Sequence, residues 1–232
     1  EKFPENYLEF VKWQINRPSF IDYELFDGVT DKDVDAYINK LYEEKAAFED
    51  RDLPHIKQLI KELRRFDVTH PFTEVEEARC KLLEARMLDE SLEELSEKQR
   101  ESKQQKLLQE ALSIMEDLDF EYSDNQYIER IYAETLIDNG EIEKAKAIYE
   151  SLLELDEKNY TAMLGKANCI FLEGDAENAK EQVEDVLEDR VQDADSLLLL
   201  DKITVVLAEK YEKQLQDELE SDICYKLGWC YY

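Results

Sequence analysis

Apolar and polar positions in residues 127–193 follow one pattern that occurs twice, with the spacing that separates Gly140 from Gly174. Each copy has two helix-length segments, and a small residue stands in the middle of each of them. These are Ala133 and Ala167 in the first segments, and Ala145 and Ala179 in the second segments. Small side chains at such places let two helices approach closely. The pattern therefore predicts two copies of a helical hairpin.

The same spacing marks the turns and the contacts between hairpins. Gly140 and Gly174 end the first segments, and glycine adopts the left-handed conformation of a helix-ending turn at little cost. Four residues after each second-segment alanine comes a larger side chain, Tyr149 or Val183. We expect these two side chains to fill the space between neighbouring hairpins.

A repeat of this length, about 34 residues with two helices per copy, resembles the tetratricopeptide-repeat family. The end of the chain is similar to the family's first-helix pattern W-x-x-L-G-x-x-Y in Leu227, Gly228 and Tyr231, with Cys224 in the Trp place. The resemblance implies an all-α fold, a right-handed α-solenoid of antiparallel helical hairpins. Within residues 126–193, the two units depart from the family pattern at three positions. Glu129 and Met163 replace its Trp, and Ala133 and Ala167 replace its Gly. Glu157 and Val191 replace its Pro.

Residues 1–30 are predicted to form a helix from Phe3 to Asn16, which Pro18 ends, and an aromatic segment with Phe20, Tyr23 and Phe26. Aromatic residues outside a repeat have two interpretations. They can cover the open apolar end of a solenoid, or they can form a docking surface for another protein.

Residues 31–125 are predicted to form divergent helical hairpins. The first pairs a helix with Val34, Tyr37, Ile38, Leu41 and Tyr42 on one face with a helix over residues 54–66, whose stripe is Ile56, Leu59, Ile60 and Leu63. A long helix is expected from about Thr73 to Leu95, with Val75, Ala78, Leu82, Ala85 and Leu92 packed. Residues 96–105 should hold a loop and a helix start. Residues 103–119 fit a second helix in the repeat register, because Ala111 and Met115 precede Ala145 and Tyr149 by one full period.

In residues 194–232 the period is expected to fail, since Gly228 lies nearly two periods after Ala167, where the pattern requires one. The added stretch is apolar and contains neither Gly nor Pro, so it predicts one long helix, either continuous or broken near Glu209. A last first-helix segment should then begin at Ser221. The added helix would tilt this segment or form an extra wall of the groove.

The chain has 58 acidic and 29 basic residues and a formal net charge of -29. Such a field repels nucleic acid and anionic lipid and favours a neutral or basic protein partner. The alternative is a solvated surface that keeps a helical array soluble. No apolar run approaches the roughly 20 residues of a membrane span. A start at Glu1 without Met, and an end inside a repeat helix, suggest a piece of a longer protein.

No pattern in the sequence indicates catalysis, a cofactor or a metal site. The four cysteines, at 80, 169, 224 and 230, have no CxxC pair, and His55 and His70 lie apart in segments without a nucleophile motif. Glycine-rich phosphate loops are absent. We therefore expect a non-enzymatic protein in a reducing compartment, which we take to be the cytoplasm.

The resemblance also implies a binding site, because first helices line the concave groove of the family's solenoids. Carried over by register, the groove stripe comprises Tyr127, Arg130, Glu134 and Ile137 in the first unit, and Thr161, Leu164, Asn168 and Phe171 in the second. The last helix would add Asp222, Tyr225, Trp229 and Tyr232. Spacings of three and four keep each set on one helical face. The alternative is that Phe171, Trp229 and Tyr232 are packed by the added helix or by further repeats.

These features favour a protein-interaction scaffold whose groove binds a peptide or a helix of a partner. A second hypothesis is the repeat arm of a multidomain co-chaperone of the J-domain type, or of a regulator, whose activity lies outside this chain. Co-chaperone members of the family clamp a C-terminal carboxylate with Lys, Arg and Asn side chains. Arg130 and Asn168 fit such a clamp, but Glu134 and Leu164 do not, so an acidic tail is a poor ligand.

Overall fold

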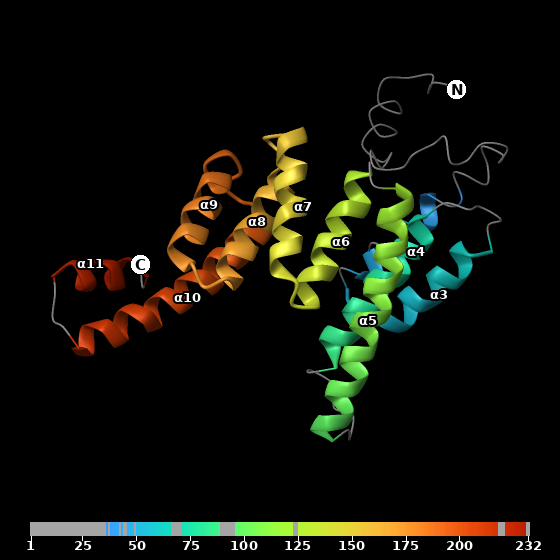
Figure 1. The fold of residues 1–232 in the computed structure, drawn as a ribbon, viewed down its shortest axis with the longest axis horizontal. Helices are drawn as coiled ribbons and strands as arrows, with labels where there is room; N and C mark the ends of the chain where they lie inside the picture. Colours follow the sequence, from blue (N-terminus) through green and yellow to red (C-terminus); the bar gives the residue numbers. More distant parts are fainter. Residues whose placement is uncertain are drawn as a thin grey trace. The chain divides into compact units, whose positions relative to one another are not determined.

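The computed structural model describes residues 36, 38–41, 43, 46–48, 50–65, 71–88, 96–122, 125–217 and 221–230, and their regular structure is helical throughout (Figure 1). The fold is all-α and solenoid-like, since most of the described helices pack against the next one along the chain. Contacts divide the chain into two compact units, one ending at Ile128 and the other beginning at Glu129. The predictions for residues 1–30 and for Val34, Tyr37, Tyr42, Phe66, His70, Leu92, Leu95, Tyr231 and Tyr232 lie outside the described residues.

The first unit contains α3 (Leu53–Leu63), α4 (Phe72–Met87) and α5 (Glu97–Tyr122), and α4 packs against both of the others. Helix α3 begins after Asp52, whose carboxylate accepts a hydrogen bond from the backbone N–H of His55. The stripe predicted for this helix is confirmed, because Ile56, Leu59, Ile60 and Leu63 are all buried.

Two helix ends in the first unit differ from the prediction. The helix that was expected to reach Leu95 ends at Met87, followed by Leu88 at the C-cap. Helix α5 begins at Glu97, so residues 97–105 are helix and not a loop. Ser96 starts it early, because its backbone N–H donates to Oε1 of Gln99 at 3.1 Å and its hydroxyl reaches the same oxygen at 2.7 Å. The polar residues that follow are good helix formers.

The second unit contains most of α6 (Gln126–Asp138), then α7 (Ile142–Leu155), α8 (Tyr160–Leu172), α9 (Ala176–Asp189), α10 (Ala194–Asp217) and α11 (Ser221–Cys230). From α7 onward, each helix packs against the next. Both predicted turns are confirmed, since φ is 81° at Gly140 and 96° at Gly174. The same hydrogen bond closes each turn, from Glu141 N to Leu136 O at 2.9 Å and from Asp175 N to Ile170 O at 3.2 Å.

The repeat register extends further than the sequence predicts. Asn125, Asn159 and Asp193 follow one another at intervals of one period, and each accepts a hydrogen bond from a backbone N–H in the first turn of the helix that follows it. Helix α10 therefore starts in register, so the period continues past Asp193 before it fails within residues 194–232, as expected. The small Ser196 is buried in its first turn, as Ala162 is in α8.

The register is lost inside α10. Ala208 stands one period after Gly174, and it is helical, so the turn that ends the earlier first helices is missing. The prediction of one long helix is confirmed, because α10 runs for 24 residues. The alternative break near Glu209 is wrong, and the residues there are good helix formers that permit the helix to continue.

Tyr149 of α7 packs against α8 at Gly165. The Tyr149 side chain is 2% exposed, and a Cβ atom added at Gly165 would overlap the atoms of its ring. Glycine in a helix interior is less favourable than alanine by roughly 1 kcal/mol. The absence of a side chain at residue 165 therefore has a packing reason, and the expectation that Tyr149 fills the space between hairpins is confirmed.

We predict that Gly165→Ala lowers the free energy of unfolding by about 1–3 kcal/mol, because the added methyl group overpacks the core against Tyr149. In a Tyr149→Ala background the clash is gone, and the same change should be neutral or stabilising. Urea unfolding of the four proteins of this cycle, followed by circular dichroism, measures the difference. If Gly165→Ala lowered the free energy of unfolding equally in the parent and in Tyr149→Ala, the packing argument would be contradicted.

Candidate partner-binding surface

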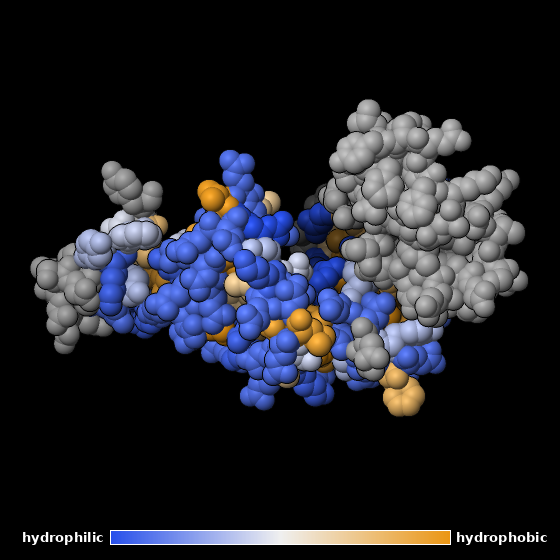
Figure 2. Space-filling model, turned by 90° about the horizontal axis from the view of Figure 1, so that it is seen from above, coloured by the Kyte–Doolittle hydropathy of each residue, from blue (hydrophilic) through white to orange (hydrophobic). Residues whose placement is uncertain are grey.

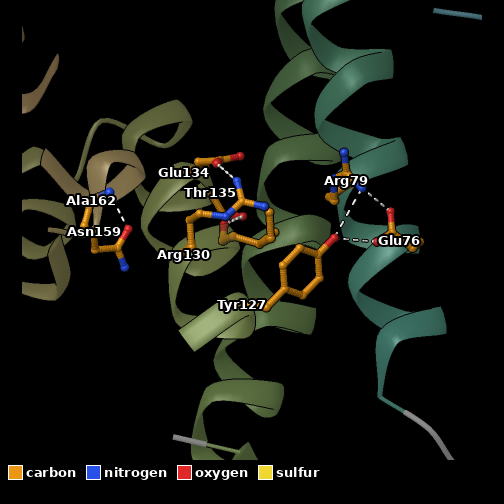
Figure 3. Close-up of polar contacts among 9 residues, drawn as sticks. Glu76, Arg79, Tyr127, Arg130, Glu134, Thr135, Asn159 and Ala162 are labelled. Atoms are coloured by element: carbon orange, nitrogen blue, oxygen red, sulfur yellow. Dashed lines mark hydrogen bonds and ion pairs between the residues drawn. The ribbon is translucent and has the colours of Figure 1, made fainter. Parts of the chain in front are cut away.

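Tyr127, the first predicted groove residue, is part of a hydrogen-bond network in the first unit (Figure 3). Its hydroxyl donates to Oε1 of Glu76 at 2.7 Å, and Nη1 of Arg79 lies 2.5 Å from the other oxygen of that carboxylate. Glu76 is 4% exposed, so these contacts supply partners that a buried carboxylate needs. The ring of Tyr127 meets that of Phe72 edge to face, with centroids 5.1 Å apart. The structure thus gives Tyr127 a packing role.

On α6, the two charged groove residues bind each other. Nη1 of Arg130 donates to Oε1 of Glu134 at 2.5 Å across one helical turn (Figure 3). Ile137, one turn further along, is half-buried. The carboxylate of Glu134 offsets the charge of the guanidinium, which reduces the attraction of Arg130 for the carboxylate of a ligand.

The four predicted residues of α8 divide into two kinds. Thr161 is exposed and Asn168 is half-buried. Leu164 and Phe171 pack against a core cluster that contains the α10 residues Leu199, Ile203, Leu207 and Tyr211. Phe171 is therefore packed by the added helix, which was the alternative stated for this residue. Of these four residues, Thr161 is the exposed one.

On α11, two aromatic side chains are exposed four residues apart. Tyr225 is 69% exposed and Trp229 is 58% exposed. Nζ of Lys180, on α9, lies 4.5 Å from the centre of the Trp229 ring, close enough for a cation–π contact. Leu227 and Cys230 of the same helix pack on the core cluster that also receives Leu164 and Phe171. The structure therefore brings α8 and α11 onto one cluster.

Ion pairs join successive helices of the second unit. Nζ of Lys146 on α7 lies 2.6 Å from a carboxylate oxygen of Glu173, and this hydrogen bond raises the pKa of the lysine. Nζ of Lys210 on α10 lies 2.7 Å from Oε1 of Glu177 on α9, and this hydrogen bond lowers the pKa of Glu177. These contacts are exposed, so they contribute more to the alignment of the helices than to stability.

Sequence reasoning missed an apolar surface on α10. Leu197, Leu198, Val205 and Val206 are between 43% and 62% exposed, although the opposite side of the helix is buried. The signal was present, because residues 197–200 are four consecutive leucines and a surface helix normally carries one apolar stripe. Elsewhere, the described surface in the view of Figure 2 is mostly hydrophilic, with small separate hydrophobic areas.

The part of the chain that the structure describes contains no group of His, Cys, Asp and Glu side chains that could hold a metal ion. Within those same ranges, no helix has the length and apolar character that crossing a membrane requires.

The geometry above is that of stacked helical hairpins with Gly turns and polar caps that recur at a fixed period. A family model described as "Tetratricopeptide repeat" matches residues 136–203. This segment is therefore similar to tetratricopeptide repeats. The match includes the beginning of α10, in agreement with the cap at Asp193. Tetratricopeptide repeats generally mediate protein–protein interactions, and they are typically scaffolds without catalytic activity.

No curated protein matches the chain. Among solved structures, the chain is similar to a tetratricopeptide repeat protein from Parabacteroides merdae. The sequence identity is 16%, the match covers 85% of this chain and 73% of that chain, and the TM-score is 0.44.

Proposed function

We propose that the second unit is a protein-interaction scaffold that binds a peptide or a helix of a partner protein along α8 and α11. The observation that carries this proposal is the pair of exposed aromatic side chains on one face of α11, Tyr225 and Trp229. Tyrosine and tryptophan are enriched among the side chains that dominate binding energy at protein interfaces. The groove stripe of α8 packs on the same core cluster as α11, so both helices belong to one body.

The partner that suits this surface is neutral or basic. The chain carries a net charge of -29, and Arg130, the groove cation that could attract a carboxylate, is engaged by Glu134. A carboxylate ligand would meet repulsion from the acidic surroundings. We place the protein in the cytoplasm, a proposal supported by the buried free thiols of Cys80 and Cys169. Burial raises the pKa of the Cys169 thiol to about 11, which keeps it protonated and unreactive.

The test is to capture partners from lysate of the source cells on the immobilised chain and on two variants with equal net charge. Thr161→Lys with Asn168→Lys adds two positive charges to the groove stripe, where Thr161 is exposed and Asn168 half-buried. The control variant, Ala147→Lys with Glu143→Gln, makes the same change in net charge at two exposed sites of α7. We expect the parent and the α7 variant to capture the same basic or neutral partner protein. The stripe variant should capture at least tenfold less of it.

A third variant, Tyr225→Ala with Trp229→Ala, should lose the same partner, because it removes the exposed aromatic pair. Circular dichroism checks that each variant is folded. Equal capture by the parent, the stripe variant and the aromatic variant would show that the partner binds elsewhere, and the proposal for α8 and α11 would be abandoned.

A further inference from the structure

A cleft of about 380 Å³ opens among α7, α8 and α9, on a part of the second unit that the proposed groove does not use. Its lining consists of Leu153, Glu157, Met163, Lys166, Gln182 and Asp185. Met163 and Glu157 stand where the family pattern has Trp and Pro, so the cleft lies at two positions where this repeat lacks those residues.

The cleft faces away from the groove stripe. Successive residues of an α-helix are about 100° apart around its axis. On α8, this spacing puts Met163 and Lys166 on the side opposite to Thr161 and Asn168. A ligand in the cleft would therefore leave the stripe residues uncovered, and the two surfaces can be tested independently.

Two lining residues, Glu157 and Asp185, are exposed carboxylates. Among the described residues, the side chains of Glu157 and Asp185 have neither a hydrogen-bond partner nor an ion-pair partner. The one cation of the lining, Lys166, is engaged, since its Nζ lies 3.2 Å from Oε1 of Glu150. The cleft therefore presents uncompensated negative charge.

The remaining lining residues are apolar or accept hydrogen bonds. Leu153 and Met163 are half-buried and offer an apolar wall. Nε2 of Gln182 already donates to Asn178 Oδ1 at 3.1 Å, which leaves its amide oxygen as an acceptor. An apolar wall next to two carboxylates and an amide oxygen matches a side chain with a long aliphatic stem and a cationic, donor-rich head.

We infer that this cleft binds the side chain of an arginine or lysine in a basic segment of a partner protein. The methylene groups lie along Leu153 and Met163, and the cationic head donates to Glu157 and Asp185 in charge-assisted hydrogen bonds. The net charge of -29 attracts such a segment from a distance, and the cleft selects the side chain at contact.

The experiment uses the whole chain with 13C-labelled methionine methyl groups. The chain has 3 methionines, and Met163 lies in the cleft while Met87 and Met115 belong to the first unit and serve as internal references. The probe is the tripeptide acetyl-Gly-Arg-Gly-amide, and the control is the same peptide with neutral citrulline in place of arginine. We expect a saturable shift of the Met163 signal with the arginine peptide and at least tenfold weaker binding of the citrulline peptide.

Two variants of equal net charge separate the cleft from general electrostatic attraction. The double variant Glu157→Gln with Asp185→Asn should bind the arginine peptide at least tenfold more weakly than the parent. The double variant Glu143→Gln with Glu209→Gln, which removes two exposed carboxylates outside the cleft, should change the affinity less than twofold. Met163→Trp keeps every charge and fills the cleft. Anisotropy of the fluorescein-labelled arginine peptide should show at least tenfold weaker binding to it.

Several outcomes would overturn the inference: a shift that never saturates, equal binding of the citrulline peptide, equal losses in both charge variants, or undiminished binding to folded Met163→Trp. The stripe variant Thr161→Lys with Asn168→Lys should still show a saturable Met163 shift. A failure of the proposed groove is thus distinguishable from a failure of the cleft.

Discussion

A Tyr149→Ala variant is expected to lose about 3–5 kcal/mol of the free energy of unfolding of the second unit. The Tyr149 side chain is 2% exposed, and its ring lies against the backbone of Gly165, where no side chain of α8 can fill the space left behind. The loss combines the transfer free energy of a large aromatic ring with the cost of an unfilled cavity. Burial also raises the pKa of its hydroxyl far above the usual range of tyrosine.

Urea unfolding followed by circular dichroism measures this loss, and hydrogen exchange of α7 and α8 amides shows where it falls. Tyr225→Ala is the matched control, because Tyr225 is 69% exposed and its replacement removes the same atoms from a solvated site. Its effect should stay within about 0.5 kcal/mol. Similar losses for the two variants would show that Tyr149 is not a core residue of the stack.

A Tyr127→Phe variant is expected to lose about 1.5–3 kcal/mol in the first unit, the usual range for a hydrogen bond to a charged group. The change keeps the ring against Phe72 and removes the hydroxyl that donates to Glu76 at 2.7 Å. Glu76 is 4% exposed, so water replaces the lost donor poorly. Hydrogen exchange of α4 amides, together with urea unfolding, measures the effect.

Tyr160→Phe is the control for this prediction. The hydroxyl of Tyr160 donates to Oδ2 of Asp189 at 2.9 Å, and this contact lies at the surface, where water can take the place of the hydroxyl. We expect little or no change in stability. A large loss in Tyr160→Phe, or none in Tyr127→Phe, would mean that burial of the carboxylate does not determine the cost.

Much of the fold was predictable because the chain marks its turns locally. Gly140 and Gly174 adopt positive φ as expected, since glycine is the residue for which this conformation is inexpensive. The continuation of the register into α10 was missed, because Asp193 was interpreted as the end of a unit although it caps the next helix. A cap looks the same in sequence whether the repeat stops or continues after it.

The surfaces were harder to predict, because they depend on residues distant in sequence. The helical period placed Leu164 and Phe171 on one face of α8, but only the position of α10 shows that they pack on a core cluster. The reason for Gly165 lies in Tyr149, on another helix. The cleft is lined from α7, α8, α9 and the connection at Glu157, so no single segment contains its signal.

The uninterrupted course of α10 has a mechanical consequence. With a rise of 1.5 Å per residue, its 24 residues span about 36 Å, whereas the 13 residues of α8 span about 20 Å. The helix packs on the core cluster of α8 and α9 from Leu199 to Tyr211, and α11 also packs on it. An α-helix without a break moves as a rigid rod, so a tilt of about 5° at the Asp193 end displaces the Asp217 end by about 3 Å. Because α8, α9 and α11 all pack on this one rod, it couples them mechanically, and a small rearrangement of the repeats is transmitted along its length to α11.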